Sequence, residues 1–205
     1  VEGLVSGPAA DLDYPEDRIR AESSVLDGVS LIGSGSHVER LWTRPSISII
    51  GLDSTRTADA SNTLIPSVRA KVSLRVAPGD EATSALEKLT RHLEAHAPWG
   101  AEVTVTPGRE SGQPGVIDAQ GPVYDTARAA FRDAWDGVEP VDIGVGGSIP
   151  FIASFQKAFP EAAVLVTGVE DPDTRAHGAN EGLHLAEFER VCLAETLLLH
   201  RLGTP

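Results

Sequence analysis

The sequence predicts an α/β protein in two parts: an antiparallel sheet with helices on one face, then the C-terminal part of a parallel sheet covered by helices. Three observations predict this fold class. Residues 67–78 alternate between apolar and polar side chains as a half-buried strand does, and residues 79–98 carry apolar side chains at helical spacing. Residues 162–168 form an uninterrupted apolar run, which is typical of a strand buried on both faces of a parallel sheet.

The first part is expected to contain two helices and three strands. A proline followed by acidic residues favours a helix start at residue 15, because negative charge stabilises a helix N-terminus. In the strand at 67–78, Val72 and Leu74 would face the core, whereas Lys71 and Arg75 would face solvent. The expected elements are a helix over 15–27, strands over 45–52 and 67–78, a helix over 79–98 and a strand over 101–107.

The second part begins after the Gly/Pro-rich segment 108–115 and is expected to be mostly helical. Its elements are helices over 121–135, 149–159 and 185–202 and the apolar strand over 162–168. A parallel sheet needs several neighbouring strands, and only one is evident here. We therefore interpret the second part as the closing segment of a larger α/β domain, and we divide the chain into domains 1–110 and 111–205.

Composition limits the classes of function. The 205-residue chain is 41% apolar with a formal net charge of −13, which argues against nucleic acid and anionic membranes as partners, since both attract basic surfaces. No apolar run approaches the ~20 residues of a membrane span. The single cysteine, Cys192, excludes an internal disulfide and fits a reducing compartment, so we expect a cytoplasmic protein. Because the sequence contains no methionine, we expect it to be a piece of a longer protein.

Two polar segments are candidates for chemistry. Residues 172–184, PDTRAHGANEGLH, form either a solvated connector or a loop through which the scaffold presents functional side chains. Residues 141–151, VDIGVGGSIPF, combine glycines, Ser148 and a helix start, a pattern suited to binding a carboxylate or simply to starting a helix. The second segment lacks the lysine of a P-loop and the last glycine of a serine nucleophile elbow.

Single residues leave alternatives open. His177 alone does not make a metal site, since metals usually take three or four protein ligands. His92 and His96 lie one helical turn apart, but no third ligand is evident, which favours a solvated helix face. Arg75 is either a solvated charge or a planar group that binds a carboxylate through two hydrogen bonds. Thr63 would ordinarily be a β-residue at the start of a strand.

Four segments, taken in order, resemble a known family. They are RLWTRPSISIIGLD, SNTLIPSVRAKVSLRVAPG, GVGGSIPF and VLVTGVEDPDTRAHGANEGLHLAEFER. They resemble the lid and the final catalytic segment of the zinc-dependent metallopeptidase family that includes aminoacylase, carboxypeptidase G, succinyl-diaminopimelate desuccinylase and carnosinase-type dipeptidases. The resemblance covers nearly the whole chain, and the Gly-Gly-Ser-Ile-Pro turn and the His-x-x-Asn-Glu loop are its most specific parts.

The resemblance implies a fold and a reaction. The first part would be a ferredoxin-like lid that mediates a homodimer, and the second would be the end of a catalytic domain with two zinc ions, manganese and cobalt being left open as alternatives. The substrate would be a dipeptide or an N-acyl amino acid, whose amide bond the full-length enzyme hydrolyses. The implied site residues are His177 as a metal ligand, Asn180 and Glu181 as support behind it, and Thr63, Arg75, Gly147 and Ser148 as substrate-binding groups.

The resemblance also implies what this chain lacks. The family's general base and its remaining metal ligands lie upstream of the segments matched here, so no catalytic residue is assigned and the chain alone is expected to be inactive. One alternative is a non-catalytic dimerisation or interaction module derived from the same fold. A serine hydrolase that uses Ser148 is a further alternative, although no histidine and aspartate are recognisably placed for it.

Overall fold

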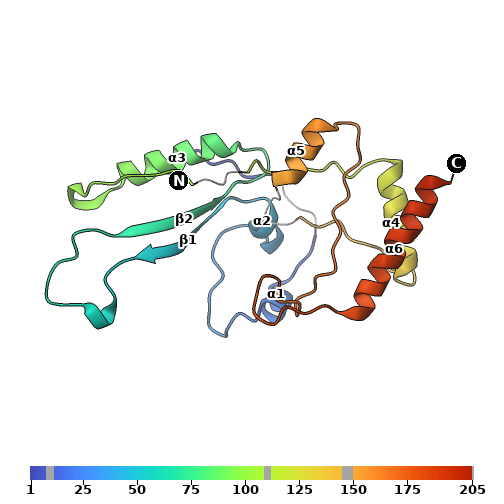
Figure 1. Ribbon diagram of the computed structural model, residues 1–205, viewed down its shortest axis with the longest axis horizontal. Coiled ribbons are helices and arrows are strands. Elements are labelled where there is room, and N and C mark those ends of the chain that lie inside the picture. The colour runs from blue at the N-terminus through green and yellow to red at the C-terminus, as the bar shows by residue number, and fades with distance from the viewer. Residues whose placement is uncertain (8–11, 109–111, 145–149, 205) are drawn as a thin grey trace. The chain divides into compact units, whose positions relative to one another are not determined.

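The computed structural model describes residues 1–7, 12–108, 112–144 and 150–204 (Figure 1). The chain divides into two compact units, each assembled from segments that are separated in the sequence. The first unit consists of Val1–Leu12, Gly33–Gly115 and Val145–Pro150, and the second of Asp13–Ile32, Val116–Gly144 and Phe151–Pro205.

Most of the expected elements are present. In chain order they are α1 (Glu16–Ser23), α2 (His37–Trp42), β1 (Ser46–Asp53), the 3₁₀ turn η1 (Thr57–Asp59), β2 (Arg69–Arg75), α3 (Ala82–Ala95), the 3₁₀ turn η2 (Pro98–Gly100), α4 (Pro122–Ala134), α5 (Pro150–Ala158) and α6 (Leu185–Gly203). The five predicted helices and the first two predicted strands are confirmed, with ends that differ by a few residues.

One helix, α2, was not predicted, although its start is marked in the sequence. The Ser36 hydroxyl accepts a hydrogen bond from the Glu39 backbone N–H, and the Glu39 carboxylate accepts one from the Ser36 N–H. This reciprocal pair is a capping box, which a serine followed three residues later by a glutamate predicts. The helix also buries the side chain of Val38, which is 1% exposed.

Strands β1 and β2 form an antiparallel pair in the first unit. Ser46 lies opposite Arg75 and Asp53 lies opposite Arg69, with an irregularity between Ile49 and Gly51 that adds one residue to β1. Because side chains alternate between the faces of a strand, one face is polar and the other apolar. The polar face carries Arg69, Lys71, Ser73 and Arg75, all exposed, whereas Val72 and Leu74 on the other face are half-buried.

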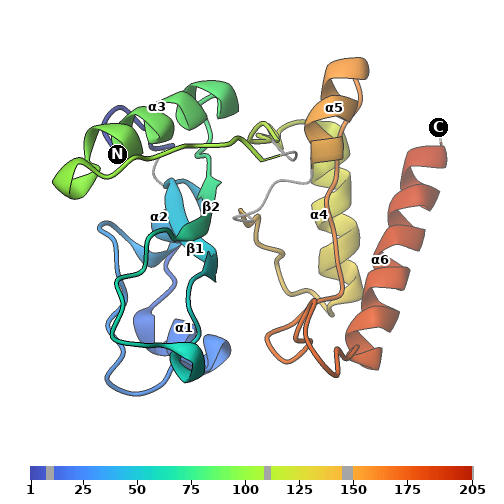
Figure 2. The same cartoon turned by 60° about the vertical axis from the view of Figure 1, so that its left-hand side comes forward.

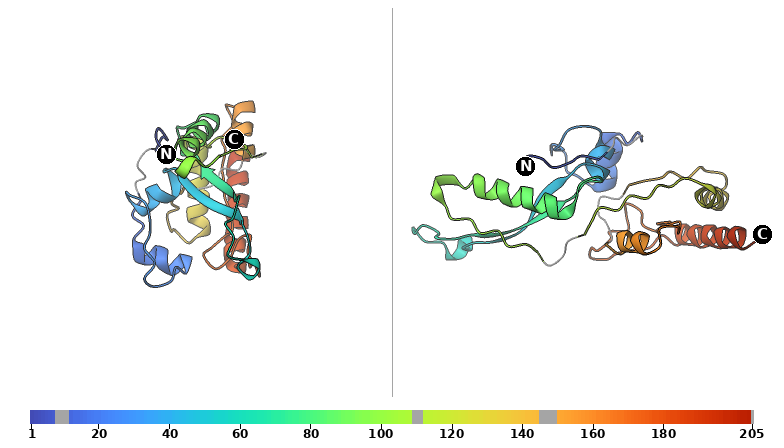
Figure 3. Two further views of the ribbon diagram at one scale, coloured as in Figure 1. Left: turned by 90° about the vertical axis from the view of Figure 1, so that its left-hand side faces the viewer. Right: turned by 90° about the horizontal axis from the view of Figure 1, so that it is seen from above.

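Helix α3 follows β2 and runs alongside the two strands (Figures 1 and 3). Asp80, just before the helix, accepts hydrogen bonds from the backbone N–H groups of Val5 and Glu81 and from Lys88 Nζ. The N–H groups of Val5 and Glu81 are the largest causes of a lowered pKa of Asp80. These bonds fasten the N-terminal segment to the start of α3, whose Ala82, Ala85 and Leu89 are buried.

Helices α4 and α6 form the packed part of the second unit, side by side in Figure 2. Their core contains Ala127, Ala130 and Leu198. Polar bonds surround these contacts: Trp135 Nε1 donates to Glu187 Oε2 at 3.0 Å and Arg190 Nη1 donates to the Ala134 carbonyl at 2.9 Å. The small alanine side chains of α4 allow close approach of α6, which stabilises both helices.

The prediction of strands over 101–107 and 162–168 is wrong, because neither segment forms a strand in the described part of the chain. The described sheet consists of β1 and β2 only. A strand requires a neighbour that accepts and donates its backbone hydrogen bonds. Among the described residues no second strand lies beside 162–168, and the Val164 N–H donates instead to the Tyr124 hydroxyl at 3.2 Å.

Leu198→Ala should destabilise the α4/α6 pair by about 2–4 kcal/mol, because the side chain is buried at 8% exposure and its removal leaves a cavity. Leu199→Ala is the matched control, since Leu199 is 72% exposed and its loss should change stability by less than about 0.5 kcal/mol. Amide hydrogen exchange in α4 and α6 measures the effect. Equal exchange rates in the two variants would contradict this packing.

Candidate functional site

The loop that carries His177 is closed by a buried threonine. Thr174 is 5% exposed, its hydroxyl accepts a hydrogen bond from the Asp171 N–H at 2.9 Å, and its carbonyl accepts one from the Gly182 N–H at 3.0 Å. The Thr174 hydroxyl also lies 3.2 Å from Asp171 Oδ1, to which it donates. Thr174 therefore joins both ends of the segment 171–182, and the residues between them protrude as a defined loop.

Three non-glycine residues of this loop have left-handed backbone conformations. The φ angles are 57° for Arg175, 62° for His177 and 57° for Asn180. Such conformations cost of order 1 kcal/mol or more each and persist only where surrounding contacts impose them. The Gly178 N–H donates to the Arg175 carbonyl at 2.7 Å and the His177 N–H lies 3.3 Å from Glu181 Oε2. The loop thus holds the His177 side chain in an exposed position.

Glu181 and Asn180 were predicted to support His177. The contact that the structure describes joins the Glu181 carboxylate to the His177 backbone N–H. In the described residues no hydrogen bond joins either side chain to the imidazole ring. Glu181 therefore acts on the backbone that orients His177, which is a positioning contact.

The predicted substrate-binding residues divide between the described and the undescribed parts of the chain. Thr63 is exposed, and its hydroxyl accepts a hydrogen bond from Ser61 Oγ at 3.2 Å. Arg75 is exposed at the end of β2, and its guanidinium makes no ion pair with any described residue. Gly147 and Ser148 lie outside the described residues. Thr63 and Arg75 belong to the first unit, whereas His177, Asn180 and Glu181 belong to the second.

The described residues do not form a metal centre with three or more protein ligands. Within them, no group of three or more His, Cys, Asp or Glu side chains lies close enough together to hold a metal ion. His177 offers one imidazole, whereas a zinc site takes three or four protein ligands. No helix of the described chain has the length and apolarity of a membrane span.

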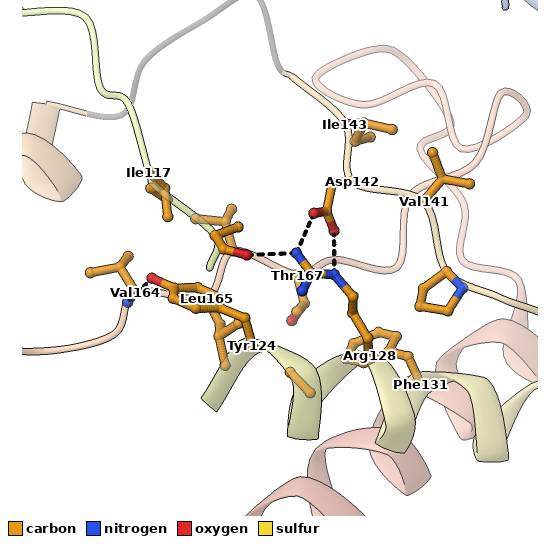
Figure 4. A pocket seen from close by; sticks show the side chains of 14 residues that line it. Ile117, Tyr124, Arg128, Phe131, Val141, Asp142, Ile143, Val164, Leu165 and Thr167 are labelled. Carbon is orange, nitrogen blue, oxygen red and sulfur yellow. Dashed lines mark hydrogen bonds and ion pairs between the residues drawn. The ribbon is translucent and has the colours of Figure 1, made fainter. Parts of the chain in front are cut away.

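A pocket that was not predicted lies over α4 in the second unit (Figure 4). Its volume is about 290 Å³, and three extended segments and the outer face of α4 line it. The residues that line it are Ile117, Ala119, Tyr124, Ala127, Arg128, Phe131, Pro140, Val141, Asp142, Ile143, Val164, Leu165, Val166 and Thr167.

Arg128 connects the walls of this pocket. Its Nη2 donates to Asp142 Oδ2 at 2.6 Å (Figure 4) and to the Ala119 carbonyl at 2.7 Å. Its Nη1 lies 3.3 Å from Asp125 Oδ1. The hydrogen bond with Asp142 is the main cause of a raised pKa of Arg128. Because the guanidinium is occupied by these partners, Arg128 fastens two extended segments to α4. Arg128 lies between the apolar residues Tyr124 and Phe131 at helical spacing, and this is the sequence feature that could have revealed the pocket.

Thr174→Val should open the loop at 171–182, because it leaves the Asp171 N–H without its partner at the cost of about 1–3 kcal/mol. Exchange of the Gly182 amide, which donates to the Thr174 carbonyl, should become faster. Thr174→Ser keeps the hydroxyl and serves as the control. If Thr174→Val left Gly182 exchange at the wild-type rate, the threonine would not be what closes the loop.

The chain is similar to known peptidases. The model of the family described as "Peptidase dimerisation domain" matches residues 10–101. A cysteinylglycine-S-conjugate dipeptidase of Corynebacterium striatum is 34% identical over 93% of this chain and 42% of its own length. A β-Ala-His dipeptidase of Homo sapiens is 30% identical over 85% of this chain and 34% of its own length. The chain thus spans less than half the length of these relatives.

Solved structures give the same result for the fold. A dipeptidase from Saccharomyces cerevisiae matches 92% of this chain and 40% of its own, with a TM-score of 0.75 and 25% identity. Human carnosine dipeptidase 1 matches 97% of this chain and 45% of its own, with a TM-score of 0.75 and 23% identity. The chain belongs to the M20 metallopeptidase family and corresponds to a C-terminal portion of its dipeptidase members.

Proposed function

We propose that this chain is the lid and the closing catalytic segment of a metallopeptidase that hydrolyses the amide bond of dipeptides or N-acyl amino acids. The observation that carries the proposal is the similarity to a dipeptidase over 93% of the chain. The constrained loop that exposes His177 supports it, because a fixed backbone and an accessible imidazole suit a metal ligand. Residues 1–110 would be a ferredoxin-like lid, and residues 111–205 would complete a parallel-sheet domain.

In this proposal the lid binds the carboxylate end of the substrate. Arg75 presents a planar guanidinium that makes no ion pair within the described residues, and such a group can donate two parallel hydrogen bonds to one carboxylate. Thr63 already accepts a hydrogen bond from Ser61, which leaves the Thr63 hydroxyl proton for the substrate. Gly147 and Ser148 would add donors from the glycine-rich turn.

The metal would be completed by residues outside this chain. His177 supplies one ligand, with Glu181 holding its backbone, and two zinc ions, or manganese or cobalt, require further carboxylate and imidazole ligands. No general base is assigned here, so the chain alone is expected to be inactive. Its role in the reaction is to bind and orient the substrate and to contribute one metal ligand. We place the protein in the cytoplasm.

A non-catalytic dimerisation module is the second candidate, favoured by the match of residues 10–101 to a dimerisation domain. The mass of the natural gene product distinguishes the two. A mature protein of 21.6 kDa, the mass of this chain, would favour the module. A mature protein of about twice that mass would favour the enzyme.

Arg75→Lys in the full-length enzyme tests the substrate-binding proposal. Lysine keeps the charge but loses the planar fork, so kcat/KM for free-acid dipeptides should fall by roughly 10- to 100-fold, and that for carboxyl-blocked analogues should change little. Arg69→Lys, on the same exposed face of β2, is the matched control and should leave both substrates unaffected. Equal losses on free and blocked substrates would exclude carboxylate binding by Arg75.

Ile49→Lys should convert the proposed homodimer to monomers. Within the part of the chain that the structure describes, strand β1 is paired on one side only, and Ile49 and Leu52 are 69% and 65% exposed, so this apolar edge strand suits a second copy. A charged side chain on such an edge opposes pairing. Leu199→Lys, at an equally exposed position on α6, is the control and should remain dimeric. Sedimentation equilibrium of the full-length protein measures the change, and a monomeric wild type would refute the dimer.

A further inference from the structure

Two histidine side chains meet near the C-terminal end of α3. The ring centroids of His92 and His96 are 4.2 Å apart, and the ring planes are inclined by 31°. Histidines four residues apart lie on one face of a helix, and this is the spacing with which helices present two imidazoles to a single metal ion. His96 is exposed and His92 is half-buried, so solvent reaches the pair.

The protonation of the His96 ring is set by the helix. Its Nδ1 lies 2.7 Å from the His92 carbonyl oxygen. A carbonyl can only accept, so Nδ1 carries the proton and the lone pair of the neutral ring is on Nε2. Metal-binding histidines usually donate their other N–H to a carbonyl or carboxylate in this way, which fixes the ring and raises its basicity as a ligand.

The charge state of His92 also suits a metal. Partial desolvation, followed by the neighbouring His96, lowers the pKa of His92, which favours the neutral ring. Neutral imidazole is the form that binds metals, and protons compete less with the metal when the pKa is low. Of the two nearby charges, the Val1 ammonium also lowers the pKa of His92, and the Glu2 carboxylate acts in the opposite direction with a smaller effect.

We propose that His92 and His96 form a two-imidazole site for one divalent transition-metal ion, with water as the remaining ligands. The two rings lie in contact with each other, which keeps both imidazoles within reach of one ion. Imidazole ligands select copper, nickel and zinc over magnesium and calcium, and Cu²⁺ should bind most tightly of the three. Because the ion links two consecutive turns, it also stabilises the end of α3.

The experiment titrates Cu²⁺ into the 205-residue chain and its variants by calorimetry. The wild type should bind one ion, and His92→Gln and His96→Gln should each weaken that binding by roughly 100-fold, because either change removes the chelate. His200→Gln, a lone exposed histidine on α6, is the matched control and should bind as the wild type does. His177→Gln should also leave this binding unchanged.

A spectroscopic measurement on the wild type keeps the proposal testable if a variant fails to fold. Electron paramagnetic resonance of the 1:1 Cu²⁺ complex should show hyperfine coupling from two imidazole nitrogens. Coupling from a single imidazole would overturn the site. A decrease in Cu²⁺ affinity of no more than about twofold in His92→Gln or His96→Gln would also overturn the site, since independent surface histidines give that result. Loss of Cu²⁺ binding in His177→Gln alone would overturn it as well.

Discussion

Pairing of backbone hydrogen bonds is the constraint on which the rest of this structure depends. Each buried or sheet-forming N–H and C=O group needs a partner, and an extended segment becomes a strand only where a second segment supplies those partners. β1 and β2 supply them to each other, and their register puts Arg75 on an exposed polar face and Leu74 on the opposite one. Segments 101–107 and 162–168 have apolar side chains suited to strands but no neighbouring strand in the described chain. The second unit is held together instead by the packing of α4 against α6 and by the hydrogen bonds of Arg128 with Asp142 and the Ala119 carbonyl.

This constraint explains which elements the sequence could predict. Helices satisfy their hydrogen bonds within one segment, so the spacing of Ala85 and Leu89 was enough to locate α3. β1 and β2 are close in sequence and pair with each other, and alternation of apolar and polar residues was enough to locate β2. The strand at 162–168 needed partners that its own sequence cannot specify, and its apolar run was therefore misleading. Helix α2 was missed for a different reason: six residues give too short a pattern for periodicity, and only its capping box marks it.

The residues of the candidate site come from the resemblance, whereas the geometry of their loop comes only from the structure. The resemblance pointed to His177, yet the residue types Arg175, His177 and Asn180 do not predict left-handed backbones at all three, since asparagine and histidine are enriched in that region but arginine is not. Thr174 is an ordinary polar residue in the sequence, and its role as the buried closure of the loop follows from contacts with Asp171 and Gly182. Arg128 was missed because a cation on a helix is usually a solvated charge.

The charge of the exposed face of β2 supports the proposed role of Arg75 in binding a carboxylate. The chain carries 30 acidic and 17 basic residues, so an arginine at its surface has many potential partners. Arg18 and Arg190, among others, pair with acidic neighbours, whereas Arg69, Lys71 and Arg75 make no ion pair within the described residues. An exposed ion pair stabilises a protein by less than about 1 kcal/mol, so leaving these cations unpaired costs the fold little. A desolvated, bidentate carboxylate bound by the same guanidinium gains more, about 1.5–3 kcal/mol for charged hydrogen bonds. An unpaired Arg75 can therefore gain this free energy by binding a ligand. Because Arg75 lies at the end of a paired strand, a bound carboxylate would have a fixed orientation.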